Sequence, residues 1–356
     1  MRGYVILLLV MAVAAGAIRL FGGAPLFSVV WDYAYWIGLV IACAAIVAWI
    51  FREFLRRAMP EFIAKPMRHA PLTAAFGILV IFIYAALSIG APIFAPYGEA
   101  EIFKQINVLP GGDPALGGHP AHFLGTDQIG RDILSRLIYG ARNTVGIAFI
   151  TTALSFFIGV TLGFLAATLG GWTDQALSRG VDVLMAIPLL IFALLLMTIA
   201  SEWSYRSGIS LTWFMVMIIA VLDSTRVFRL ARAVGSNIVV MDYIEAAKIR
   251  GETLGHLVFR EILPNAMSPL LAEFGLRFCF VFLTIASLSF LGIGIQPPLA
   301  DWGTMVRDLA QFINFAAYDP LTASLPLMAA SAIALLTVAV NFVVDWMLHN
   351  TSGLKE

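Results

Sequence analysis

Two ionisable side chains interrupt one of the most apolar stretches of the chain. Glu273 and Arg277 lie four positions apart, acid first, in the run that begins at Pro264. Side chains at this spacing share one face of a helix, where they can form a neutral pair. Ionisable groups inside long apolar helices are costly and often functional. The pair could meet the opposite charges of a zwitterionic solute, or it could lock two helices together.

The usual motifs of enzyme chemistry are missing from the sequence. It has no GxxxxGK[ST] phosphate loop, no HExxH, no GxSxG and no paired cysteine motif. Cys43 and Cys279 stand alone inside apolar segments, where a packing role is the commoner one. We therefore expect no catalytic residue, no metal site and no cofactor in this chain, and any energy source must be a partner.

A polar, basic stretch lies between two long apolar runs, and residues 245–264 read EAAKIRGETLGHLVFREILP. It predicts a short helix over 245–249, a sharp turn at Gly251 and a second short helix over 256–261. Pro264 suits the first turn of the next helix, where its missing N–H is harmless. Such a loop can transmit motion from an attached protein; the alternative is an ordinary amphipathic loop. The residues expected at this contact are Glu245, Ala246, Ala247, Gly251, Leu263 and Pro264.

The composition indicates a membrane protein, because 60% of the residues are hydrophobic, 12% are charged and the mean hydropathy is +0.91. About 20 apolar residues are needed for a helix to cross the hydrocarbon. Long stretches without charged residues, bounded by Pro, Gly and aromatic residues, predict eight membrane helices. They lie at roughly 4–21, 32–51, 72–95, 144–169, 183–200, 211–229, 266–292 and 324–348.

Basic residues set the expected orientation. Between the second and third segments, acidic Glu53 and Glu61 are outnumbered by Arg52, Arg56, Arg57, Lys65 and Arg68. This excess places the linker, and with it both termini, on the cytoplasmic side. Arg2 and the small residues 15–17 also resemble a cleavable secretory signal. Cleavage would leave the remaining topology unchanged.

Several other residues carry expectations about local structure. Gly125-Thr126-Asp127 predicts a helix start on the outer side, with Asp132 and Arg136 four apart on one face of that helix. Gly159 and Gly163 allow close helix packing. Asp223 and Asp345 are expected near helix ends, where they reach the interface, and Trp302 is expected at the headgroup level.

Two further stretches carry a resemblance. Residues 122–142 (HFLGTDQIGRDILSRLIYGAR) and 286–306 (ASLSFLGIGIQPPLADWGTMV), together with the loop at 242–264, resemble the second permease subunit of dipeptide, oligopeptide and nickel importers driven by ATP-binding cassettes. Asp242-Tyr243 and Asn265 flank the loop as in that family, over a match covering about 70–350. Glu261 stands where the generic loop signature has isoleucine, an arrangement similar to this family's own variant.

The resemblance implies an all-α polytopic protein of the bacterial inner membrane, with about eight transmembrane helices. Residues 71–350 would form the six-helix permease domain, and 351–356 a short cytoplasmic tail. Residues 1–70 would add an extra pair of membrane helices and the basic linker to the family pattern. In the plainest interpretation the extra pair braces the assembly in lipid.

The resemblance also implies partners: a homologous second permease subunit, two ATPase subunits or a fused pair that bind ATP and Mg, and an extracytoplasmic substrate-binding protein. Membrane lipid surrounds the complex, and nothing points to nucleic acid. Candidate contacts for the binding protein are Asp127, Arg131, Asp132, Asp301 and Arg307, with internal ion pairing as the alternative. Glu273 and Arg277 would then line the translocation path.

The solute is the least determined feature. Short peptides lead, with opines, other peptide-like conjugates, oligosaccharides and nickel behind them. Two different classes of protein remain: a self-contained secondary transporter, for which Glu273 is the one fair ion site, and a membrane-embedded enzyme. Co-purification with ATPase subunits separates the importer permease from both.

Overall fold

The computed structural model describes residues 25–58, 70–315 and 319–351. The predicted segment 4–21, the signal-like residues 15–17, linker residues Lys65 and Arg68, and the tail after Thr351 lie outside this part of the chain. Within it the chain is helical, and pairing between extended segments is limited to three isolated bridges. The predicted all-α fold is confirmed.

Seven helices in the described ranges are long and apolar enough to cross a membrane, and they coincide with the second to eighth predicted segments. Helices outnumber spans because short helices occupy the loops. The helices are α2 (Pro25–Ala58), α4 (Leu72–Phe94), α5 (Ile133–Gly140), α6 (Gly146–Leu169), α7 (Gly171–Ala186), α8 (Leu189–Ser207), α9 (Leu211–Val239), α10 (Asp242–Ile249), α11 (Leu254–His256), α12 (Leu263–Phe290), α13 (Trp302–Leu309), α14 (Pro320–Ala323) and α15 (Leu325–Thr351).

The chain forms two compact units that meet in sequence at Leu79 and Val80, inside α4. In the first unit, α2 ends in a basic turn that is tied locally. Arg52 donates to the carbonyl oxygen of Ala70 at 3.1 Å, and Glu53 pairs with the next two arginines of its helix. The second unit holds every remaining helix and all of the predicted sites.

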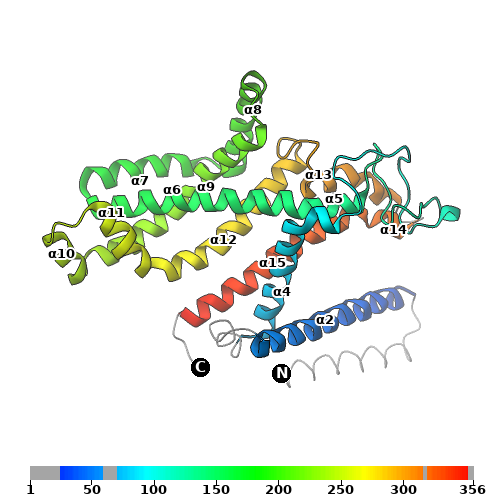
Figure 1. Cartoon of the computed structure of the whole chain (residues 1–356), viewed down its shortest axis with the longest axis horizontal. Helices are drawn as coiled ribbons and strands as arrows, with labels where there is room; N and C mark the ends of the chain where they lie inside the picture. Colours follow the sequence, from blue (N-terminus) through cyan, green and yellow to red (C-terminus); the bar gives the residue numbers. More distant parts are fainter. Residues whose placement is uncertain (1–24, 59–69, 316–318, 352–356) are drawn as a thin grey trace. The chain divides into compact units, whose positions relative to one another are not determined.

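Helices α6 and α9 lie side by side in the second unit (Figure 1). Their contacts advance together in steps of four residues, so the two helices run parallel. A Cβ atom on Gly159 would lie 2.6 Å from Cβ of Val227, and one on Gly163 would lie 2.7 Å from Cβ of Ala231. The prediction of close packing at these two glycines is confirmed, because no larger residue fits there.

The segment that connects α6 to α9 differs from the prediction. We expected an inner loop over 170–182 and a single span over 183–200, but the chain forms α7 and then α8, with a break at Ile187 and Pro188. Ile187 is extended, as residues before proline tend to be. Asp174 and Asp182 of α7 pair with Arg232 and Arg229 of α9, respectively.

The helix predicted to start near Gly125-Thr126-Asp127 begins later. Asp132 is the N-cap of α5 and accepts from the backbone N–H of Ser135 at 2.8 Å. A π-helical turn (Ala141–Val145) then joins α5 directly to α6. The outer helix is therefore the first part of a membrane helix. Figure 1 shows α10 and α11 at one end of α6 and α12, and α5 and α13 at the other end.

Candidate functional site

The predicted coupling loop is a helical hairpin with a defined turn. Helix α10 ends at Ile249, and Gly251, two residues later, has a φ of +80°, which favours glycine. Gly251 N–H donates to Lys248 and Glu252 N–H to Ala247, which closes the helix end. Thr253 then caps α11. The predicted short helix and turn are confirmed, but the expected second short helix continues through a π-helical segment into α12, where Pro264 occupies the first turn.

The hairpin has two different faces. Ile244 and Ala247 are fully buried and belong to a core that includes Phe164 of α6, Ala231 of α9 and Ala266 of α12. Movement of α10 would therefore act directly on three membrane helices, since protein cores are close-packed and transmit strain. Glu245, Ala246 and Gly251 face outward with their side chains or backbone exposed, whereas Leu263 is half-buried and Pro264 is exposed.

The outward face of the hairpin is also apolar, which the sequence reasoning missed. Ile249 is 81% exposed and Val240 79% exposed, and both lie beyond the long apolar runs. Met241, Tyr243 and Phe259 add to this surface. The signal was present as large apolar residues inside a polar stretch. An apolar surface with charged neighbours is typical of a protein interface.

Four of the five candidate docking residues are buried and paired within the chain. Asp127 accepts from the backbone N–H of Ile129 and from both the backbone and the side chain of Arg131, the last at 2.7 Å. Asp132 binds His122 Nδ1 at 3.0 Å and both the backbone N–H and the hydroxyl of Ser135. These side chains hold the loop between α4 and α5 against α5.

Asp301 performs a similar role at α13. It is the N-cap of that helix and accepts from Thr304 N–H at 2.9 Å and from the Thr144 hydroxyl at 2.8 Å. Burial raises the pKa of this carboxyl, and the two hydrogen bonds oppose the rise. Arg307, the fifth candidate, pairs with Asp308, and its side chain is 41% exposed. It is the one member of the set that a partner could contact directly.

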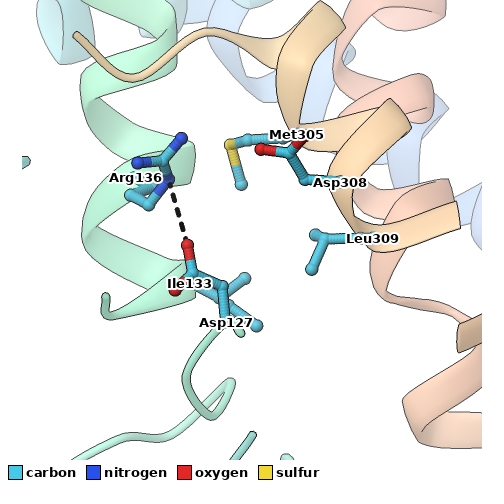
Figure 2. A pocket seen from close by; sticks show the side chains of 6 residues that line it. All are labelled: Asp127, Ile133, Arg136, Met305, Asp308 and Leu309. Carbon is cyan, nitrogen blue, oxygen red and sulfur yellow. Dashed lines mark ion pairs between the residues drawn. The ribbon is translucent and has the colours of Figure 1, made fainter. Parts of the chain in front are cut away.

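Arg136 does not pair with Asp132 as expected from their spacing. Its Nε lies 3.9 Å from Oδ2 of Asp127, beside a small cavity that Met305 and Asp308 of α13 also line (Figure 2). The cavity volume is about 10 Å³, too small for any solute. This outer cluster is therefore a frame that joins the loop, α5 and α13.

Trp302 lies inside this frame, where it is 2% exposed and contacts other side chains, and its place at the headgroup level stays a prediction. Its indole N–H donates to the carbonyl oxygen of Leu137 at 2.9 Å, and its ring packs edge-on against Tyr84 and Phe282. A Cβ atom on Gly140 would lie 2.4 Å from the indole ring. The tryptophan thus fixes α13 against α5 and α12.

Glu273 and Arg277 form the predicted pair on α12, and they do not stand alone. Arg277 Nε lies 2.8 Å from Glu273 Oε1, in an orientation that gives a charge contact without a well-directed hydrogen bond. Arg277 Nη1 lies 3.7 Å from Asp223 of α9, which accepts from the Ser155 hydroxyl at 2.9 Å. The prediction that Asp223 reaches the interface is wrong: it is 2% exposed and sits in mid-helix. Asp345 is exposed.

Two cavities follow α12 beside this charged group. The one nearer the outer end has a volume of about 410 Å³ and a mostly apolar lining that includes Leu283, Phe290 and Val306. The deeper one has a volume of about 190 Å³ and is lined by Asp223 and Arg277 among others. Leu190 of α8 lines both. Both cavities therefore border α12, and Leu190 separates them on the side of α8.

Comparison with known proteins decides the family. A family model described as the binding-protein-dependent transport system inner membrane component matches residues 159–351. The dipeptide transport system permease protein DppC of Haemophilus influenzae is 36% identical over 245 residues, covering 68% of this chain and 79% of the relative. The chain belongs to the binding-protein-dependent transport permeases. The glutathione transport system permease protein GsiD of Pectobacterium atrosepticum is 32% identical over 297 residues, covering 83% and 88% of the two chains.

The permease is thus a subunit of a binding-protein-dependent importer driven by ATP-binding cassettes. It is a multi-pass membrane protein and a transport component, and its family implies ATPase and substrate-binding partners. The predicted role as an importer permease is confirmed, and the secondary transporter and membrane enzyme are set aside. The family match spans the hairpin and α12, and so includes both the predicted coupling loop and the charged group.

Proposed function

We propose that this permease carries short peptides or peptide-like solutes. The named relatives include dipeptide and di/tripeptide permeases, at 36% and 33% identity. The charged group on α9 and α12 offers both signs of charge at mid-helix depth, which suits a zwitterion. Opines, oligosaccharides and nickel are the alternative cargoes. The glutathione permease among the relatives favours peptide-like solutes over the other classes.

The proposed complex contains a homologous second permease subunit and two ATPase subunits or a fused pair, on which ATP and Mg bind. The hairpin at 242–264 supplies the contact with the ATPase through Glu245, Ala246, Gly251 and the apolar residues around them. The observation that carries this proposal is the two-faced hairpin. Its buried face is continuous with the cores of α6, α9 and α12, while its outward face is apolar and exposed.

On the outer side, we assign the binding-protein contact to the surface around Arg307. Asp127, Arg131, Asp132 and Asp301 serve this contact by fixing the loop and α13 from within. Glu273 and Arg277 line the path between that surface and the hairpin. The solute would enter at the α13 end when the binding protein docks, and closure of the ATPase dimer would move the hairpin and α12.

Both termini are proposed to be cytoplasmic, with residues 1–70 as an accessory membrane unit, residues 71–350 as the permease domain and 351–356 as a short tail. Arginines at the end of α2 support this orientation. Thiol labelling in a variant without native cysteines tests it. Ser210→Cys should react with an impermeant reagent from outside, whereas Gly255→Cys should react only after the membrane is opened; the reverse pattern contradicts the orientation.

The decisive experiment measures peptide-stimulated ATP hydrolysis and ATPase co-purification for Gly251→Asp. A side chain at Gly251 meets open space within the chain, and Asp tolerates a positive φ better than most residues. The variant should fold, yet lose at least about tenfold of its stimulated activity because the added group obstructs the partner. Gly208→Asp is the matched control, since Gly208 has φ +71° and open space but lies after α8. Equal behaviour of the two variants contradicts coupling through the hairpin.

A further inference from the structure

The deeper cavity beside α12 gathers positive charge from three different elements. It lies among α8, α9 and α12 and is lined by Leu189, Leu190, Asp223, Arg226, Arg277 and Phe280, with a volume of about 190 Å³. Sequence reasoning selected only Arg277 of this set as a path residue. Arg226 lies near the end of the predicted segment 211–229, at the expected start of a cytoplasmic loop, but α9 continues to Val239 and leaves Arg226 in mid-helix.

The two arginines are compensated very differently. Arg277 is 7% exposed and lies between its two ion-pair partners, Glu273 and Asp223. Its Nη1 nevertheless lacks a hydrogen-bond partner. Arg226 is exposed, and no ion pair to it is found in the described part of the chain; its guanidinium lies 5.8 Å from the centre of the Phe280 ring. Arg277 lies over the same ring at 4.4 Å.

The start of α8 adds a third positive feature. Leu189 and Leu190 form its first turn, and no side chain caps it because the residue before it is Pro188. The free N–H groups and the helix dipole give this end of a helix a partial positive charge that attracts anions. A helix start, an arginine without an ion pair in the described residues and an arginine with an unused N–H thus meet at one cavity.

We propose that this cavity binds the carboxylate of the transported solute, with Arg226 as its principal partner and the first turn of α8 behind it. The proposal rests on the peptide function given above and adds the chemical group that the permease recognises. Arginine suits this task because its planar N–H groups match the two oxygens of a carboxylate. Asp223 and Glu273 both form ion pairs with Arg277, so Arg226 is the arginine of this cavity that has no acid within ion-pair distance among the described residues.

The neighbouring cavity accounts for the rest of the solute. It is larger, about 410 Å³, and mostly apolar. Both cavities border α12, and Leu190 of α8 lines both of them. A short peptide could place apolar side chains there while its carboxylate lies at Arg226. Recognition of an end group, with a permissive apolar space beside it, would let one permease accept peptides of many sequences.

Uptake into proteoliposomes tests the proposal with the complete importer and one binding protein. The probes are a radiolabelled dipeptide and its C-terminal amide, chosen as a pair that the binding protein holds equally well. Arg226→Gln should lower uptake of the free acid about tenfold, as expected for loss of a charged hydrogen bond, and uptake of the amide less than twofold. Arg229→Gln is the matched control: it removes an arginine of the same helix that pairs with Asp182 outside the cavity.

The outcomes separate the proposal from the function on which it rests. If Arg226→Gln lowers uptake of acid and amide by the same factor, or changes neither, carboxylate recognition at this cavity is wrong while peptide transport stands. If Arg229→Gln alters the ratio as much as Arg226→Gln does, the effect is not local and the proposal also fails. If the wild-type complex takes up neither probe but does take up a sugar or nickel, both the peptide function and the proposal are overturned.

Discussion

Arg277 of α12 lies between two acids, with Nη1 3.7 Å from Oδ1 of Asp223 and Nε 2.8 Å from Oε1 of Glu273. Removing one member of a buried charge pair leaves the other uncompensated and costs about 3–5 kcal/mol. We expect Arg277→Met to lower the melting temperature of the purified complex strongly. Adding Asp223→Asn should restore part of the loss, because it removes one of the two stranded acids.

Thermal unfolding in nanodiscs measures the melting temperatures of the two single variants and the double variant. A double variant whose loss equals the sum of the two single losses would show that Asp223 and Arg277 do not interact across α9 and α12. Ser155→Ala adds a useful reference, since it removes only the hydroxyl that Asp223 accepts from.

The close contact of α6 with α9 predicts a sharp size limit at Gly163. A methyl group there would meet Cβ of Ala231 and the carbonyl oxygen of Phe228, both at 2.7 Å. Gly163→Ala must separate the helices and should destabilise the complex by about 1–3 kcal/mol. Gly146→Ala is the control: nothing lies within 4 Å of the added atom, and the helix gains about 0.5–1 kcal/mol. Equal melting temperatures for the two variants would contradict this packing.

Local chain chemistry made the helical hairpin at 242–264 predictable. Gly251 has the positive φ that its place after a short helix demands, and Pro264 lies where its missing N–H does no harm. Gly159 and Gly163 predicted that α6 packs closely against another helix, but they did not indicate that this helix is α9. Features of this kind depend on neighbours in sequence and can be read from it.

The charged group could not be derived in the same way. The end of the apolar run near Arg226 and Arg229 suggested the end of a helix, whereas packing against α6 and α7 carries α9 ten residues further. Asp223 is therefore buried in the interior, whereas the sequence predicted that it reaches the membrane interface. Which acid meets Arg277 is decided by tertiary contacts between α9 and α12, and spacing along one helix gives only Glu273.

The exposed apolar face of the hairpin predicts a direct contact with the ATPase. Ile249 is 81% exposed, so Ile249→Ser should change the stability of the permease by no more than about 0.5 kcal/mol. It should nevertheless weaken ATPase binding several-fold, measured by titrating the ATPase onto permease in nanodiscs. Ile209→Ser makes the same change after α8, far along the sequence from the hairpin, and should have no effect on that titration. Loss of binding in both variants, or in neither, would remove Ile249 from the interface.

Arg307 is the accessible member of the predicted docking set. Reversing its charge in Arg307→Glu should raise the concentration of binding protein needed for half-maximal stimulation of ATP hydrolysis several-fold, more so at low salt, because complementary charges mainly speed association. Arg206→Glu is the control, since Arg206 is also exposed and pairs with a nearby acid, at the end of α8. A shift that ignores salt, or one that both variants share, would speak against a charge contact at Arg307.

Asp301 predicts a pH dependence of stability. Burial raises its pKa in the folded protein above the ordinary value of 3.8, so the folded state holds this proton more tightly than the unfolded state. Its contribution to stability is therefore fully present below pH 3.8 and is lost as the pH rises through the folded value. Asp301→Asn stays neutral at every pH; its one side-chain oxygen can accept from Thr304 N–H, and its NH2 group can donate to the Thr144 hydroxyl oxygen. Between about pH 4 and pH 8, the melting temperature of this variant should fall less with rising pH than that of wild type. If the melting temperatures of the two proteins change equally with pH, Asp301 binds its proton equally well in the folded and unfolded states.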